Sequence, residues 1–391
     1  MARVPLPRVK PFLHFHDKGT CMNTAFSPLD AAIDRAIAEQ RIVGTVVLAA
    51  HQGRLVYRRA AGLADREAGR PMTEDAIFLL ASVTKPMVAS AVLRLVEQGH
   101  MQLDDPITRW LPGFEPRLAD GSAPVITIHQ LLTHTAGLTY SFMEPEGGPY
   151  HALGVSSGLD APGLGLQENL RRLAEAPLAY APGTGWGYSM ATDVLGAAVA
   201  AASGEPLPEA VRRLVAEPLG MSADTAFTVR ERARLVAHYG DGRPRPERMG
   251  EEHTVPFNGA PVRFAPGRIF DPASYPSGGA GMAGTAADVL KLVEALRTGH
   301  PRMREAMVGA EAQTQGPGWG FGYAGAVLID PAAAGTPQSR GTVQWGGAYG
   351  HNWFVDAQRG LSVVALTNTA FEGMAGPTTV EVRNAVYASL G

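Results

Sequence analysis

The stretch FLLASVTKPMVASAVLRLVEQGH, residues 78–100, decides how the rest of the chain is interpreted. Apolar residues recur at helical spacing after Ser82 and Gly99 follows them, so the sequence predicts a helix that begins near Ser82 and ends at Gly99. Lys85 lies three residues after Ser82 and is one of only four lysines among 34 basic residues. Residues three apart share one face of a helix, so the Ser82 hydroxyl and the Lys85 amine are expected to lie together.

This pairing of residue types points to nucleophilic chemistry. A serine hydroxyl attacks efficiently only when a neighbouring base takes its proton. A lysine amine can titrate in a protein, whereas an arginine guanidinium keeps its proton. A helix N-terminus at Ser82 adds free N–H groups that stabilise negative charge, and Pro86 is compatible with a first helical turn. The same spacing of a serine and a lysine also arises by chance on surface helices, so other residues have to support the interpretation.

Composition excludes several classes of protein. The chain has 391 residues, of which 45% are hydrophobic and 18% charged, as in a globular protein with a sizeable core and two structural lobes. A net charge of −3 without a basic run gives no footprint for nucleic acid. The small apolar stretch at 194–202 is too short to span a bilayer, so no membrane partner is expected.

The first 21 residues are interpreted as a loose N-terminal tail. They are basic and Pro-rich, and they lack the apolar segment of a secretory signal, so a dispensable tail and a cytoplasmic location are expected. Cys21 is the single cysteine, which excludes an internal disulfide and a cysteine-built zinc site. His14 and His16 match no metal-binding motif, and no metal ion is predicted.

Strand and helix signals are distributed unevenly along the chain. Ser27 is expected to cap a helix whose first residue is Pro28. Segments 42–50 and 55–63 are typical of a strand hairpin, and further strands are expected near 320–328, 341–347, 351–356 and 361–368. Helices capped at Thr127 and Thr285, and one opened by Pro377, complete the pattern. Two long loops, 143–165 and 241–277, are too rich in Gly and Pro for regular structure and are expected to border the active site.

Strands at both ends with helices between them predict an α/β (α+β) fold. We expect an antiparallel sheet flanked by helices, interrupted by a mostly helical inserted domain. The sheet domain would comprise residues 22–88 and 262–391, the helical domain 89–261, and the tail 1–21.

Several stretches occur in the order expected of one known superfamily: GLADREAGRPMTEDAIFLLASVTK (62–85), LLTHTAGL (131–138), PGTGWGYS (182–189), YPSGGAGM (275–282) and VQWGGAYGHNWFVD (343–356). From about residue 25 to the C-terminus the sequence resembles the serine β-lactamase and penicillin-binding-protein superfamily. The resemblance is to its class C-like branch and to the family VIII carboxylesterases. It implies a β-lactamase-like fold.

The resemblance also implies roles for individual residues. Tyr188 stands in the family's Y-x-N motif, with Met190 in place of the asparagine. The family pattern implies that Tyr188 lies beside Ser82 and Lys85, takes the Ser82 proton during acylation and passes it to the leaving alcohol. The alternative for Tyr188 is an aromatic residue that packs in a loop.

The third family motif, K-T-G, is replaced here by Trp345-Gly346-Gly347. The missing lysine would bind the carboxylate of β-lactams and peptidoglycan stems, whereas the aromatic face of Trp345 suits neutral esters. Gly346 and Gly347 would let the backbone approach a substrate closely. The motif position implies that the N–H groups of Ala348 and Ser82 form the oxyanion hole. A buried structural tryptophan is the alternative for Trp345.

Three further residues are of types that could act in catalysis. Ser156 in GVSSG (154–158) satisfies G-x-S-x-G, but a nucleophile elbow needs a strand before the serine and a helix after it, and neither is predicted. His351 and His134 are interpreted as structural histidines.

The sequence thus predicts a serine carboxylesterase that hydrolyses short-chain esters through an acyl-serine, without metal or organic cofactor. Its partner would be a small-molecule ester, and its oligomeric state stays open. The alternatives are a weak β-lactamase, a D-alanyl-D-alanine peptidase-like hydrolase or an acyltransferase. A non-enzymatic penicillin-binding module is disfavoured because Ser82, Lys85 and Tyr188 are all present.

Overall fold

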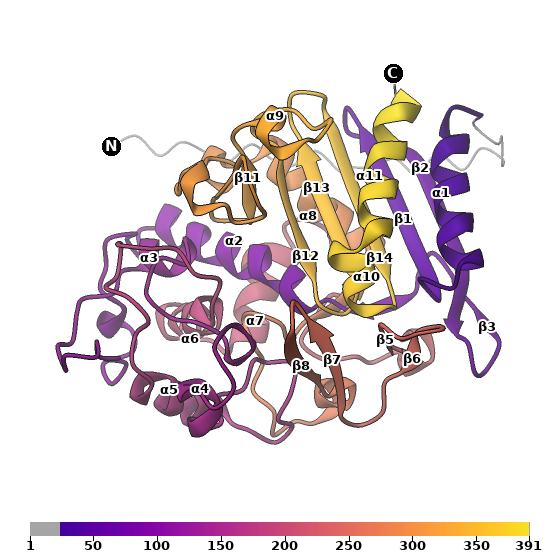
Figure 1. Cartoon of the computed structure of the whole chain (residues 1–391). Coiled ribbons are helices and arrows are strands. Elements are labelled where there is room, and N and C mark those ends of the chain that lie inside the picture. The colour runs from indigo at the N-terminus through magenta and orange to yellow at the C-terminus, as the bar shows by residue number, and fades with distance from the viewer. Residues whose placement is uncertain (1–23, 391) are drawn as a thin grey trace.

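Apolar segments from the two ends of the chain form one eight-stranded sheet (Figure 1). The computed structural model describes residues 24–390. The strand order is β10-β11-β12-β13-β14-β1-β2-β3, and each neighbouring pair is antiparallel. The strands are β1 (Gly44–His51), β2 (Arg54–Asp65), β3 (Arg70–Pro71), β10 (Trp319–Phe321), β11 (Ala326–Leu328), β12 (Val343–Gly347), β13 (His351–Asp356) and β14 (Leu361–Thr367). The predicted antiparallel sheet is confirmed.

Both faces of the sheet are buried, which explains the unbroken apolar run in β1. Side chains of a strand alternate between the two faces. Val46 and Leu48 belong to the large core that includes α8 (Ala286–Thr298), whereas Val47 and Ala49 pack with residues of the two terminal helices. The helices α1 (Ser27–Ala38) and α11 (Pro377–Leu390) lie together over this second face (Figure 1).

The remaining helices lie on the first face of the sheet, at its ends, or in the segment between the short strands β4 (Ile77–Leu79) and β9 (Ala283–Thr285). They are α2 (Thr84–Glu97), α3 (Ile128–Leu132), α4 (Pro149–Leu153), α5 (Leu166–Glu175), α6 (Ala191–Ser203), α7 (Leu207–Val211), α8 (Ala286–Thr298), α9 (Pro331–Ala334) and α10 (Ala370–Ala375). A two-stranded pair joins β4 (Ile77–Leu79) to β9 (Ala283–Thr285), and another joins β5 (Tyr239–Gly240) to β6 (Glu247–Arg248).

Capping side chains fix the start of two helices as predicted. Thr127 caps α3 in a capping box with Gln130, and Thr285 accepts a hydrogen bond from the Asp288 N–H at the start of α8. The expected cap of α1 is wrong by one residue: Ser27 is the first helical residue, and Phe26 occupies the cap position after a short 3-10 turn.

The prediction that two long loops lack regular structure is wrong in part. The first contains the short helix α4, which Pro149 opens and Gly154 ends with a left-handed backbone. The second contains a hairpin of β7 (His253–Phe257) and β8 (Ala260–Phe264). Asn258 and Gly259, with φ of 50° and 82°, form the two-residue turn, for which the Asn-Gly pair is well suited.

The division into a sheet domain (22–88 and 262–391) and a helical domain (89–261) remains a prediction, as does the tail 1–21. Most of that tail's interpreted features, including Cys21, His14 and His16, lie outside the described residues. Within residues 24–390, no helix is long and apolar enough to cross a membrane. The same residues contain no cluster of His, Cys, Asp and Glu that could hold a metal ion.

Candidate active site

Ser82 lies where a strand turns into a helix. The short strand β4 leads through Leu80 into the 3-10 turn η2 (Ala81–Val83), and α2 follows at once. The Leu80 N–H donates to the carbonyl of Met282, next to β9, which fixes this turn from behind. Ala81 has a left-handed backbone, with φ of 45°, an uncommon conformation for a residue with a side chain. The chain is therefore held in a sharp turn immediately before the serine.

The Ser82 hydroxyl contacts both polar groups that the sequence associated with it. Tyr188 OH donates to Ser82 Oγ at 2.7 Å, and Lys85 Nζ donates to the same oxygen at 3.2 Å. A second hydrogen bond, of 2.8 Å, runs from Lys85 Nζ to the Gly279 carbonyl. The structure thus brings Ser82, Lys85 and Tyr188 together, although they come from two distant parts of the chain.

Lys85 is buried among aromatic rings. Its side chain belongs to the first turn of α2, and the residue is 5% exposed. The ammonium lies 4.8 Å from the centre of the Tyr188 ring and 5.4 Å from that of Tyr140. A cation over an aromatic face is attracted by the ring quadrupole, which offsets part of the cost of burying the charge. Burial raises the pKa of Tyr140 well above its usual value, so this phenol stays neutral.

Trp345 contacts Tyr188 through its indole nitrogen as well as its ring. The Nε1–H group donates to Tyr188 OH at 3.3 Å, and the two ring centres lie 5.0 Å apart. Phe321 packs edge-on against the same indole. Sequence reasoning predicted an aromatic wall here and missed this hydrogen bond, because no sequence pattern places an indole N–H against a phenol.

Gly346 and Gly347 let strand β12 approach its neighbours closely. A Cβ atom on Gly347 would lie 2.4 Å from the Leu80 carbonyl, and one on Gly346 would lie 2.6 Å from Met374 Cγ. Both distances are too short for real atoms, so a side chain at either position would displace β12. The contact between β12 and η2 places the next residue, Ala348, beside the turn that carries Ser82.

Two buried histidines lie next to the site and form hydrogen bonds with the backbone that carries it. His351 Nε2 lies 2.7 Å from the Leu79 carbonyl and must carry the ring proton, because a carbonyl can only accept. His134 Nδ1 accepts from the Ser189 N–H, next to Tyr188. Burial lowers the pKa of His134 to about 3, with help from the Lys85 charge, and lowers the pKa of His351 to about 4. Both rings are therefore neutral hydrogen-bonding groups, in line with their structural interpretation.

Ser156 has none of the surroundings of a nucleophile elbow. It follows α4, whose end is Gly154, and the next helix, α5, begins only at Leu166. Its hydroxyl is buried and donates to Asp160 Oδ1 at 2.7 Å. The strand before the serine and the helix directly after it are thus both missing, and the expectation that G-x-S-x-G is coincidental here stays a prediction.

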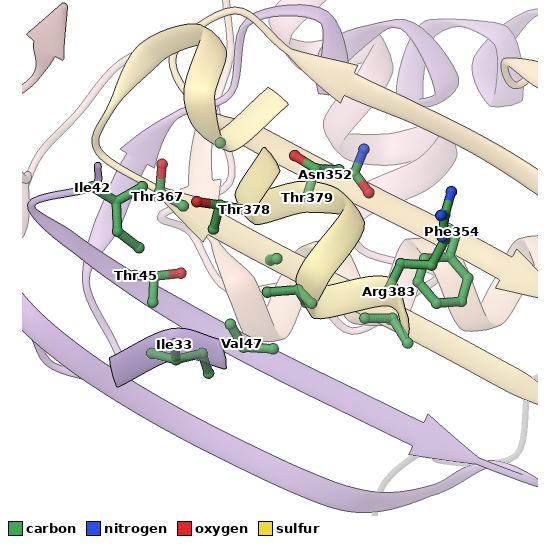
Figure 2. Close-up of a pocket in the computed structure, with 14 residues that line it drawn as sticks. Ile33, Ile42, Thr45, Val47, Asn352, Phe354, Thr367, Thr378, Thr379 and Arg383 are labelled. Atoms are coloured by element: carbon green, nitrogen blue, oxygen red, sulfur yellow. The ribbon is translucent and has the colours of Figure 1, made fainter. Parts of the chain in front are cut away.

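The described cavities are small. One of about 20 Å³ lies between the sheet and the terminal helices, and Figure 2 shows Ile33, Val47, Phe354 and Arg383 around it. Another, of about 10 Å³, is lined by residues that include Lys85, His134 and Trp345. Volumes of this size correspond to about one water molecule.

A half-buried serine and tyrosine joined to a buried lysine, beside an antiparallel sheet, define the class of serine hydrolases that acylate through an activated serine. The β-lactamase family profile matches residues 29–386, and the chain belongs to the β-lactamase family. Esterase EstB of Burkholderia gladioli is 58% identical over 371 residues, covering 92% of this chain and 94% of that protein. These matches confirm the superfamily that the sequence motifs indicated.

Solved structures agree with this placement. The hydrolase EstCE1, described as having promiscuous acyltransferase activity, superposes with a TM-score of 0.90 at 48% identity and covers 93% of this chain and 99% of its own. Simvastatin synthase (LovD) of Aspergillus terreus has a TM-score of 0.73 at 23% identity, covering 92% and 97% of the two chains, and supports the fold alone.

Proposed function

We propose that the protein is a serine carboxylesterase that hydrolyses short-chain carboxylic esters through an acyl-enzyme on Ser82. The observation that carries this proposal is the pair of hydrogen bonds that Ser82 Oγ receives from Tyr188 and Lys85. A serine oxygen with two titratable groups in reach can lose its proton as it attacks and can later return that proton. The 58% identical relative named as an esterase supports the same activity.

Acylation begins once the Tyr188 phenol, which donates to Ser82 Oγ in the structure, has released its proton to water. The phenolate oxygen then accepts the Ser82 hydroxyl proton while Oγ attacks the ester carbonyl carbon. The Lys85 ammonium, 4.8 Å from the centre of the Tyr188 ring, and the Trp345 N–H, which donates to the phenol oxygen, are both placed to stabilise negative charge that develops there. The N–H groups of Ser82 and Ala348 would bind the carbonyl oxygen as it becomes negative. Tyr188 then passes the proton to the departing alkoxide, which leaves as an alcohol.

Deacylation follows the same route in reverse. Tyr188 takes a proton from water, the resulting hydroxide attacks the acyl carbon, and the proton returns to Ser82 Oγ. These two steps need no metal ion and no organic cofactor. Trp345, Gly346 and Gly347 are proposed to border the substrate, and a tryptophan rather than a lysine at position 345 favours esters without a carboxylate.

Acyl transfer is a second candidate, because an alcohol can replace water in deacylation. The description of EstCE1 as a hydrolase with promiscuous acyltransferase activity favours it.

A cytoplasmic location is also proposed, because the chain contains only one cysteine.

The test compares turnover of p-nitrophenyl butyrate and of a chromogenic cephalosporin by the wild type, Ser82→Ala and Ser156→Ala. We expect fast ester turnover, little cephalosporin cleavage, loss of both with Ser82→Ala and wild-type rates with Ser156→Ala. Retained ester turnover in a folded Ser82→Ala protein would overturn the mechanism. Dominant cephalosporin cleavage would favour a β-lactamase instead.

A further inference from the structure

A buried carboxylate lies behind Lys85 and has no part in the mechanism above. Asp193 belongs to the first turn of α6 and is 2% exposed. The N-terminal turn of a helix favours a negative side chain, which makes an acidic residue acceptable at this depth. Burying a carboxylate still lowers the free energy of unfolding, so a carboxylate at this position is expected to have a function.

The hydrogen bonds around Asp193 favour its ionised form. Ser277 Oγ accepts from the Ala280 N–H and so donates its own proton to Asp193 Oδ1, at 2.6 Å. The other oxygen, Oδ2, has no hydrogen-bond partner among the described residues. The Ser277 hydroxyl and the Gly279 backbone N–H both lower the pKa of this carboxyl, because donors stabilise the carboxylate.

Gly279 lies between this carboxylate and Lys85. A Cβ atom at Gly279 would lie 2.4 Å from Asp193 Oδ2 and 3.3 Å from Lys85 Nζ, so the absence of a side chain lets the two groups approach each other. Within residues 24–390, the hydrogen-bond partners of Lys85 Nζ are Ser82 Oγ and the Gly279 carbonyl, both uncharged. Asp193 thus supplies negative charge to a buried ammonium that has no direct ion pair.

We propose that Asp193 is a positioning residue for ester hydrolysis: its carboxylate is the buried counter-charge that faces the Lys85 ammonium across Gly279. Through Ser277 it also fixes the 277–280 turn, whose Gly279 carbonyl accepts from Lys85. Asp193 touches neither substrate nor the reacting atoms and acts through Lys85. This inference rests on the proposed function, in which the Lys85 ammonium stabilises negative charge that develops on the Tyr188 oxygen.

Other charged and titratable groups face Asp193 and bear on its ionisation. Burial raises the pKa of the Asp193 carboxyl, while the Ser277 hydrogen bond and the charges of Lys85 and Arg268 lower it. The phenols of Tyr140 and Tyr275 have raised pKa values, mainly through burial, and stay neutral. Because folding raises the pKa of the Asp193 carboxyl, keeping this carboxylate ionised at neutral pH lowers the free energy of unfolding. An uncharged asparagine at the same position should not have this cost.

The test is the pH dependence of kcat/KM for p-nitrophenyl butyrate in Asp193→Asn. Removing the carboxylate charge disfavours positive charge in the cluster of Ser82, Lys85 and Tyr188, so the alkaline limb of the profile should move to lower pH by roughly one unit. At the optimum, kcat should fall roughly 10- to 100-fold, less than the 10²–10⁴-fold expected for a group that transfers the proton itself. The melting temperature should stay at or above that of the wild type.

Asp288→Asn is the matched control. Asp288 is also a buried aspartate that accepts hydroxyl hydrogen bonds, from Ser222 and Thr225, but it joins α8 to the 222–225 turn. Its replacement should lower the melting temperature and leave the pH profile in place. An unshifted profile in a folded Asp193→Asn protein would overturn the inference.

Ser277→Ala gives an independent test if Asp193→Asn does not fold. Loss of its hydroxyl makes the carboxylate easier to protonate, so the acid limb of the profile should move to higher pH. An unchanged acid limb would contradict the inference. The two hypotheses fail on different results. Ester turnover by a folded Ser82→Ala protein would overturn the proposed function, whereas unshifted pH profiles of the Asp193 and Ser277 variants would overturn only the role of Asp193.

Discussion

Replacing Trp345 by phenylalanine tests whether Tyr188 acts as a phenolate. The change keeps an aromatic ring against Tyr188 and removes the indole N–H that donates to its oxygen. If the phenol is neutral throughout, the loss is that of a hydrogen bond between uncharged groups. If the oxygen carries negative charge at the rate-limiting stage, the lost bond is charge-assisted and stronger.

The two cases differ enough in magnitude to be separated. Neutral hydrogen bonds contribute about 0.5–1.5 kcal/mol and those to charged groups about 1.5–3 kcal/mol. The distance of 3.3 Å between Nε1 and the phenol oxygen is long for an N–H···O bond, so the lower part of each range applies. With a factor of ten for each 1.36 kcal/mol, kcat/KM falls roughly 2- to 5-fold for a neutral phenol and roughly 10- to 30-fold for a phenolate. We expect the larger loss.

The assay is steady-state hydrolysis of p-nitrophenyl butyrate by the single variants and by a double variant with Tyr188→Phe. In the Tyr188→Phe background the Trp345→Phe change should cost little more, because its acceptor is already gone. Trp353→Phe is the control: Trp353 is paired with Trp345 across β12 and β13, and its Nε1 has no partner among the described residues. A loss below about fivefold for Trp345→Phe, or equal losses in both backgrounds, would refute the phenolate argument.

Three further predictions follow from the site and the core. Tyr188→Phe should lower kcat for p-nitrophenyl butyrate by on the order of 10²–10⁴, and a loss under tenfold would exclude Tyr188 as the proton carrier. Gly347→Ala should lower kcat by on the order of 10² with unchanged far-UV circular dichroism, because its Cβ would lie 2.4 Å from the Leu80 carbonyl and displace β12; wild-type kcat would contradict the close approach. Below pH 6.5 the buried histidines stay neutral in the folded protein but bind protons in the unfolded chain. The free energy of unfolding should therefore fall as pH drops from 6.5 toward 3, by up to about 1.4 kcal/mol per pH unit for each histidine. His238→Phe should reduce this slope in urea titrations at pH 7 and 4.5, and an unaltered slope would count against the assignment. The histidines concerned have pKa values lowered by burial to about 3, 3 and 4, and are His134, His238 and His351.

Local patterns predicted the sheet and the caps of α3 and α8 well, and missed the cap of α1 by one residue. The run at β1 and the capping residues Thr127 and Thr285 act through neighbours a few residues away, so the sequence contains their causes. The hairpin at 253–264 was missed although its signal is local: Asn258-Gly259 stands between segments that could pair, and the surrounding prolines concealed it. For this hairpin, turn chemistry was a better guide than overall proline content.

The contacts inside the site were less predictable, because they join residues far apart in the sequence. Motifs indicated that Ser82, Lys85 and Tyr188 belong together, and the structure brings their side chains within hydrogen-bond distance. No motif pointed to the bond from Trp345 to Tyr188, which spans 157 positions, or to that from Ser277 to Asp193, which spans 84. Such contacts depend on how elements meet in space, which local propensity does not determine.

The order of strands in the sheet also determines when the protein can become active during its synthesis. Strand β1 lies between β2 and β14, and the Gly44 N–H donates to Asn368, 324 positions later. At 5–20 residues per second a ribosome needs roughly 16 to 65 s to add that many residues. For that time β1 lacks one of its two neighbours, and Ser82 is made long before the strand that carries Trp345. The nascent chain therefore exposes an open strand edge that pairs readily with other chains, and the ester-cleaving site is completed only after the strand that carries Trp345 has been made.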